Sequence, residues 1–193
     1  MCQHCKKQKK YMNTLDFYIA LFIHIVSFIT AFGAVIAIDF TGLLWLLGWS
    51  KLKLAEVVRF AGITQRLIWL GWVGLVASGS VLIYHKGFID NLTKIKLYFV
   101  VLVGLNGIFL HVIKKAMEKV PGEQLPARLK FKMALASMIS QVGWWGALTI
   151  GFLHRQWRHD IPWPSSPWLA MFVITAFFAI FWLVGSILTA KKS

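Results

Sequence analysis

Thiol and imidazole side chains lie close together at the start of the sequence, in MCQHCKKQKK. Cys2 and Cys5 flank His4, and this soft ligand set suits Cu(I) or Zn²⁺. The two cysteines could instead cycle between a dithiol and a disulfide. A c-type haem attachment is excluded because Lys6, not histidine, follows Cys5. Ten residues do not supply four ligands, so a metal site would need a second chain, and the alternative is two thiols on a frayed terminus.

Four further histidines lie in or at the ends of long apolar runs, namely His24, His85, His111 and His154. An ionisable side chain inside a bilayer is costly, so such a residue is a functional candidate. His24 has only apolar neighbours in FIHIV. His85 and His154 stand in YHKG and LHRQ, where a histidine could also bond terminal helix carbonyls.

Depth along the runs favours particular pairs of these histidines. A rise of about 1.5 Å per residue places His24 about 12 Å from the N-terminal face, on the side where His85 and His154 end their runs. His111 lies about 22 Å from that face, so it forms at most a second site. Two imidazoles at one depth suit a haem iron, and Lys96 enters on the same side, where it could neutralise a propionate. We therefore expect haem b held by His24 with His154 or His85.

Five apolar runs must position these side chains, at about 17–38, 67–84, 97–113, 133–153 and 168–190. A bilayer core of about 30 Å needs about 20 apolar residues in a helix. None of the runs alternates between apolar and polar residues as a strand of a membrane barrel does, so each run is predicted to be a helix. Small residues at four-residue spacing, such as Gly71 with Gly74 and Ser78, predict close helix contacts. The fold class predicted is an all-α polytopic membrane bundle of about five transmembrane helices.

Two stretches outside the runs complete the predicted organisation. Residues 43–60, LLWLLGWSKLKLAEVVRF, predict an interfacial helix anchored by Trp45 and Trp49, the alternative being that the first helix continues into this stretch. Residues 1–14 form a basic N-terminal segment with the C-x-x-C pair, and 15–190 form one transmembrane domain.

The net charge of +14 is explained by membrane anchoring rather than by nucleic acid, because the cations stand between apolar runs. With five spans, 12 of the 21 lysines and arginines fall on the C-terminal side. That excess favours a cytoplasmic C-terminus and an outside N-terminus, although the lysines before the first run argue the other way. A cleaved signal peptide is disfavoured because the first run exceeds the roughly 7 to 15 apolar residues that such a peptide needs.

The stretches ALFIHIVSFI and KIKLYFVVLVGLNGIFLH resemble a loose group of small bacterial membrane proteins. The group includes the J-type protoporphyrinogen oxidase and the copper-resistance protein D domain. The resemblance implies haem b, a first-helix histidine at His24 and an important lysine at Lys96. It also implies a bacterial inner membrane. The leucine-proline-arginine stretch of the oxidase is absent, and Leu110 stands where its Tyr-His pair has tyrosine.

Three hypotheses follow. The first is a haem b protein that transfers electrons, either as one subunit of a larger membrane redox complex or as a homo-oligomer. The second is a copper-handling membrane protein in which Cys2, His4 and Cys5 capture the ion. The third is an accessory membrane subunit without chemistry. No nucleophile–base pair or paired carboxylates stand out, so no enzyme class is assigned.

Overall fold

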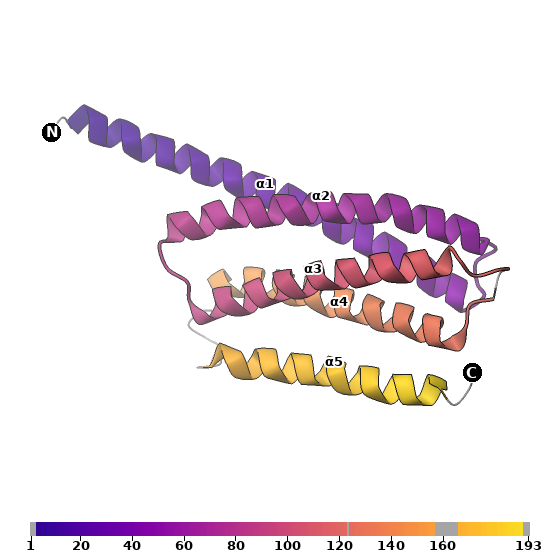
Figure 1. Ribbon diagram of the computed structural model, residues 1–193. Helices are drawn as coiled ribbons and strands as arrows, with labels where there is room; N and C mark the ends of the chain where they lie inside the picture. Colours follow the sequence, from indigo (N-terminus) through magenta and orange to yellow (C-terminus); the bar gives the residue numbers. More distant parts are fainter. Residues whose placement is uncertain (1–2, 123, 157–165, 191–193) are drawn as a thin grey trace.

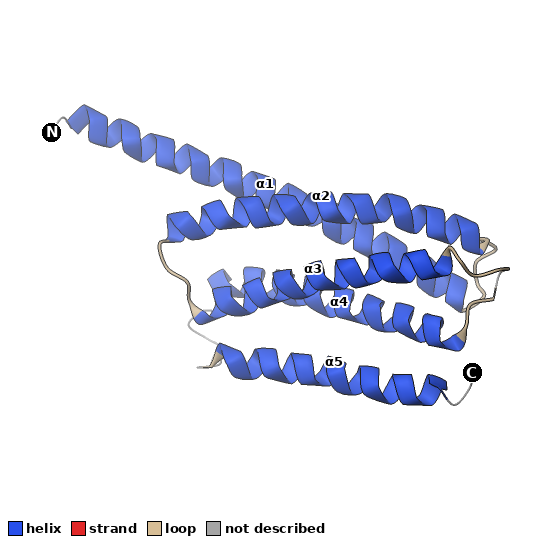
Figure 2. Ribbon diagram, viewed as in Figure 1, coloured by secondary structure: helices blue, strands red, loops and turns tan. Residues whose placement is uncertain are grey.

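Five long helices make up the part of the chain that the structure describes. The computed structural model describes residues 3–122, 124–156 and 166–190, and of 3–13 and 153–156 it describes the backbone alone. The helices are α1 (Gln3–Leu46), α2 (Leu54–Lys86), α3 (Asn91–Met117), α4 (Ala127–Gln156) and α5 (Pro167–Ala190). They run side by side in alternating directions, and the two ends of the chain lie at opposite ends of the bundle (Figure 1). No strand occurs in the described ranges (Figure 2).

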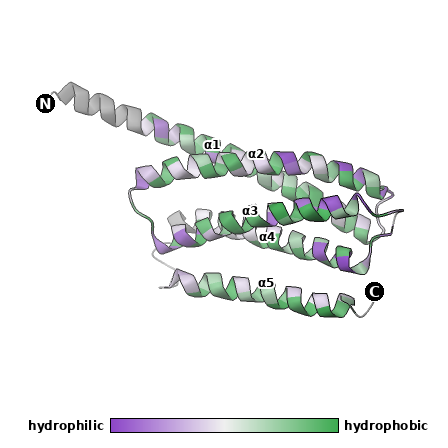
Figure 3. Cartoon of the chain, viewed as in Figure 1, coloured by the Kyte–Doolittle hydropathy of each residue, from purple (hydrophilic) through white to green (hydrophobic). Residues whose placement is uncertain are grey.

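The chain is an integral membrane protein. All five helices are long and apolar enough to cross a bilayer, and each predicted apolar run lies inside one of them. Hydrophilic residues gather toward the two ends of the helices, as a bilayer with two polar faces requires (Figure 3). The predicted all-α membrane bundle is therefore confirmed.

The interfacial helix predicted over 43–60 is wrong. Helix α1 continues to Leu46, Gly48 follows with a left-handed φ of 72°, and α2 already begins at Leu54. Glu56 caps this new start by accepting a hydrogen bond from the Lys53 backbone N–H at 2.7 Å. The physical reason is burial: Trp45 and Leu54 pack into a core cluster with residues of α3 and α4, so this stretch is not free to lie along the headgroups.

Close approaches of small residues join the helices. A Cβ at Gly71 of α2 would lie 2.6 Å from the Ala31 Cβ and from the Ser27 carbonyl oxygen of α1, so only glycine fits there. Gly146 of α4 similarly receives the ring of Phe99 from α3. Such contacts replace the hydrophobic drive that lipid removes.

An apolar cluster fills the middle of the bundle. We call it the central plug, and it consists of Ala31, Phe32, Val35, Leu75, Val103 and Trp144. Phe32 stacks on Trp144 with ring centroids 6.1 Å apart, and the buried side chains come from α1, α2, α3 and α4. On α1 the plug lies between His24 and Asp39, and it therefore separates the polar groups on its two sides.

Candidate functional site

Among the described residues, two cavities lie on either side of the central plug, within helices that span the membrane. The His24 cavity has a volume of about 400 Å³, and the Asp39 cavity about 350 Å³. Both volumes fall within the roughly 300 to 1,000 Å³ typical of small-molecule and cofactor sites. Apolar side chains form most of each wall, so the few polar groups determine what each cavity could bind.

His24 is fixed on the wall of the first cavity by Ser78 of α2. The His24 Nδ1 lies 3.0 Å from the Ser78 Oγ, and the Ser78 hydroxyl donates its one proton to the Gly74 carbonyl oxygen. The imidazole must therefore be the donor in the first contact. This arrangement selects the tautomer protonated at Nδ1 and leaves the lone pair on Nε2, which is the form that ligates a metal.

Lys96 of α3 lines the same cavity as His24, so the structure brings together these two predicted site residues. Its ammonium reaches α4, where a Cβ at Gly151 would lie 3.2 Å from the Lys96 Nζ. Neither ion pair among the described residues involves Lys96. An unpaired cation facing an apolar cavity favours an anionic group in that cavity.

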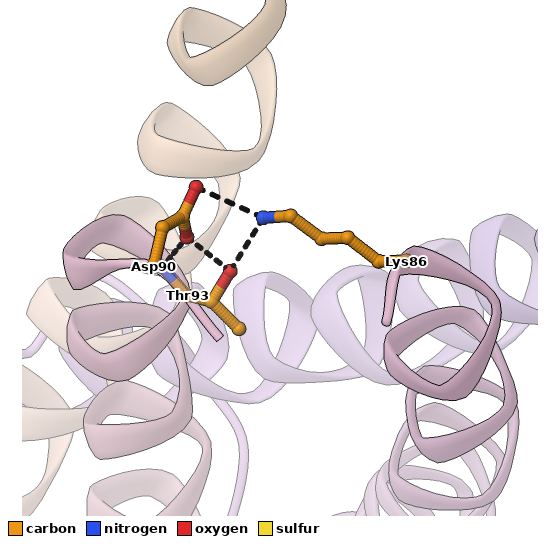
Figure 4. Close-up of polar contacts among 3 residues, drawn as sticks. All are labelled: Lys86, Asp90 and Thr93. Carbon is orange, nitrogen blue, oxygen red and sulfur yellow. Dashed lines mark hydrogen bonds and ion pairs between the residues drawn. The ribbon is translucent and has the colours of Figure 1, made fainter. Parts of the chain in front are cut away.

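A second cation, Lys86, also lines the His24 cavity. Figure 4 shows how it is held: its Nζ donates to the Asp90 Oδ2 at 2.9 Å and to the Thr93 Oγ1 at 3.0 Å. Asp90 also caps α3 by accepting from the Thr93 backbone N–H at 2.9 Å. Partial burial acts to raise the pKa of Asp90, but the hydrogen bonds from Thr93 and Lys86 and the Lys86 charge outweigh it and hold this pKa well below its usual range.

The structure does not bring His85 to the same place as His24. His85 packs edge-on against Phe17, with ring centroids 6.1 Å apart. It lies seven residues beyond Ser78, and Phe17 lies seven residues before His24, so the two imidazoles are about 10 Å apart along the helices. Two ligands of one metal ion lie about 4 Å apart, given bonds of about 2 Å.

The other predicted ligands lie elsewhere or outside the described side chains. His111 is exposed on α3, and its Nδ1 lies 3.4 Å from the Gln65 Oε1. His154 belongs to α4, four residues after Ile150 of the cavity wall, and its side chain is not among those described. The side chains of Cys2, His4 and Cys5 likewise lie outside the described part of the structure. Within the described residues, no three His, Cys, Asp or Glu side chains form a metal site.

Asp39 is a site residue that the sequence analysis missed. It lines the second cavity, where its Oδ2 accepts from the Gln141 Nε2 at 2.6 Å and a further hydrogen bond comes from Ser137. Both donors belong to α4, and no described cation pairs with the carboxylate. The signal was present in IAIDFTGLLWLL, a carboxylate with apolar residues on both sides.

Haem b is compatible with the His24 cavity on the chemistry of its donors. His24 offers an Nε2 lone pair and Lys96 offers an unpaired cation for a carboxylate, while Lys86, which is paired with Asp90, also lines the cavity. Leu75, Ile83 and other apolar side chains provide walls against which a macrocycle would pack. The Asp39 cavity has no histidine on its wall to ligate an iron, and its charged lining residues are Asp39 and Lys114.

Comparisons of this chain with protein-family models, with curated proteins and with solved structures found no match.

Proposed function

We propose that this integral membrane protein binds haem b in the His24 cavity and takes part in electron transfer. The observation that carries the proposal is the fixed imidazole of His24, which shares an apolar cavity with the ammonium of Lys96. When bound, haem b supplies one-electron oxidation and reduction.

Each polar residue of the cavity has its own role in this proposal. His24 would hold the iron through its Nε2 lone pair, and Ser78 holds the ring by accepting from Nδ1. Lys96 would neutralise one propionate from within the cavity, and Lys86, which is paired with Asp90, would attract the other less strongly. The apolar walls exclude water, which strengthens these charge interactions. The roles of His24 and Lys96 agree with those that the resemblance to the J-type oxidase implies.

A second residue that would hold the haem iron is proposed on α4. His154 follows Ile150 and Gly151, two residues of the cavity wall, by one helical turn. His85, at about 10 Å from His24 along the helices, is less well placed for the same iron. If His154 does not bind the iron, His24 would be its one protein ligand.

The setting of the protein is also proposed. We place it in a bacterial inner membrane with its N-terminus outside and its C-terminus in the cytoplasm, on the resemblance and the excess of cations on the C-terminal side. Electron transfer needs a donor and an acceptor, so other membrane redox subunits or a second copy of the chain are its proposed partners.

An absorption spectrum of the purified protein tests the proposal. The full chain is produced with haem b supplied, purified in detergent, and recorded oxidised and then reduced with dithionite. We expect a sharp reduced band and close to one haem per chain by haem quantification. A colourless protein that also fails to take up added haem would contradict the proposal and direct attention to copper at Cys2, His4 and Cys5.

A further inference from the structure

A groove with several cations lies beside the Asp39 cavity, with which it shares Lys114 and Met117, between the N-terminal half of α2 and the last turns of α3. We call it the Gly62 groove, and its volume is about 780 Å³. Its charged residues and glycines are Arg59, Gly62, Arg66, Lys114, Glu118 and Gly122. The groove plays no part in the proposed haem site, which lies on the other side of the central plug.

Gly62 allows the cations of two helices to come together. A Cβ at this position would lie 3.2 Å from the Lys114 Nζ, so the ammonium of α3 lies directly over the backbone of α2. Arg59 and Arg66 stand three residues before and four residues after Gly62, which puts them on the same face of α2. Three positive charges therefore surround one notch.

One carboxylate partly offsets these charges. The Glu118 Oε1 lies 3.6 Å from the Lys114 Nζ, one helical turn away on α3. Nearly half of the Glu118 side chain is exposed, and such exposed pairs contribute little. Three cations against one carboxylate leave the groove with a net charge of +2, which favours an anionic ligand.

The groove lies at the level where lipid headgroups are expected. The apolar run 67–84 begins directly after Arg66, and the run 97–113 ends directly before Lys114. Large apolar side chains continue from there along both helices, with Leu70 of α2 and Ile108 of α3 exposed to lipid. A ligand of this groove would thus have an anionic head and apolar tails.

We propose that the Gly62 groove binds the headgroup of an anionic phospholipid. The phosphate lies among Arg59, Arg66 and Lys114, and the acyl chains follow the exposed apolar side chains toward the bilayer centre. A lipid with a choline headgroup fits less well because its own quaternary ammonium adds a fourth cation to the site.

Lipid titration of the full chain in detergent tests this site. Phosphatidylglycerol and phosphatidylcholine with identical acyl chains are added separately, and binding is followed by native mass spectrometry and by thermal unfolding. We expect phosphatidylglycerol to bind more tightly. The double variant Arg66→Gln, Lys114→Gln should weaken phosphatidylglycerol binding about 25-fold, because each cation near a lipid surface contributes about fivefold.

Two pairs of variants make the test specific. Gly62→Ala keeps every charge, and its Cβ meets only the flexible end of Lys114, so the helix should fold while the notch is filled and binding falls. Gly33→Ala is its control, because nothing lies within 4 Å of a Cβ there. Lys119→Gln with Lys130→Gln removes two exposed cations that do not line the groove, and binding should be retained.

Three outcomes would overturn the proposal. The first is equal binding of the two lipids to the unmodified chain. The second is an equal loss of phosphatidylglycerol binding in the control double variant and in Arg66→Gln, Lys114→Gln. The third is inorganic phosphate giving the same stabilisation as the lipid at equal concentration, which would make the site one for a free anion.

Discussion

Two cavities of this membrane protein have similar volumes and different polar groups. The His24 cavity contains an imidazole and the cations Lys96 and Lys86, whereas the Asp39 cavity contains a carboxylate held by neutral donors from α4, with Lys114 elsewhere on its wall. Apolar side chains of the central plug lie between them. The comparison teaches that volume alone does not identify a site in this bundle, because the charge on the wall decides which ligand each cavity accepts.

The hydrogen-bond partners extend this difference. Ser78 accepts from His24 and thereby keeps its second nitrogen available to a ligand, whereas Gln141 and Ser137 satisfy the Asp39 carboxylate from within the protein. We therefore expect changes near His24 to alter ligand binding, and changes near Asp39 to alter chiefly the stability of the bundle.

The largest effect is expected where α1 and α2 meet, because α1 carries both His24 and Asp39. Gly71→Leu places a side chain against Ala31 and the Ser27 carbonyl, neither of which can move without shifting α1. We expect a loss of about 3 kcal/mol in the free energy of unfolding, measured in mixed micelles. Gly33→Leu faces open space and should change it by less than about 0.5 kcal/mol. Equal losses in both variants would refute the close approach of the two helices.

Removal of the unpaired cation sharpens the comparison on the His24 side. Lys96→Gln should weaken haem b binding about tenfold while leaving the ligation by His24 intact, because one charged contact to a propionate is lost. Haem titration followed by absorbance measures the change. Lys115→Gln, an exposed change near the other end of α3, is the control. Unaltered affinity in Lys96→Gln would remove the lysine from the site.

Replacement of Asp90, which caps α3, is expected to have a smaller effect on stability. Asp90→Ala should cost about 1 kcal/mol of unfolding free energy, because the Thr93 backbone N–H loses its acceptor. Asparagine keeps a capping oxygen, so Asp90→Asn should cost less.

The Asp90 carboxylate also predicts a pH dependence. Its pKa is lower in the folded protein than in the unfolded chain, so its stabilisation is fully present above the unfolded pKa of about 3.9. That stabilisation is lost as the pH falls through the lower folded pKa. Unfolding of the unmodified chain and of Asp90→Asn should therefore differ above about pH 4 and converge below it. If the difference in unfolding free energy between the two proteins stayed constant from above about pH 4 to well below it, the charged cap would be ruled out.

The smallest effect is expected at Asp39. A double-mutant cycle of Asp39→Ala and Gln141→Ala should give a coupling energy of about 0.6 kcal/mol, which is typical of hydrogen bonds between membrane helices. Unfolding in mixed micelles provides the four free energies. Haem content should be the same in all four proteins, and its loss in Asp39→Ala would show that the two cavities act as one site.

The fold could be predicted from the sequence because a bilayer imposes a length and a composition on every span. Each of the five apolar runs is therefore visible without knowledge of any contact. Residues 43–60 were not predictable in this way, since a helix at the interface and a buried helix end share the same tryptophans, leucines and lysines. The contacts of Trp45 and Leu54 with Ile113 and Met117, far away in the sequence, decide between the two.

The candidate site could be predicted only in part. His24 stands among apolar residues, so its burial in the bundle could be expected, and the boundary position of Lys96 suggested the same side of the membrane. The distance of His85 from His24 depends on the register of α1 against α2, which Ser78 sets and no local pattern reveals. Asp39 was missed because the first span was expected to end at residue 38, whereas α1 continues to Leu46.

The most direct test of the account compares His24→Ala with His111→Ala in one experiment. Both proteins are purified with haem b supplied, and their oxidised and dithionite-reduced absorption spectra are recorded beside that of the unmodified chain. The account predicts that His24→Ala loses the reduced haem band, whereas His111→Ala, which replaces an exposed histidine outside the His24 cavity, keeps it. A full haem band in His24→Ala would contradict the central claim.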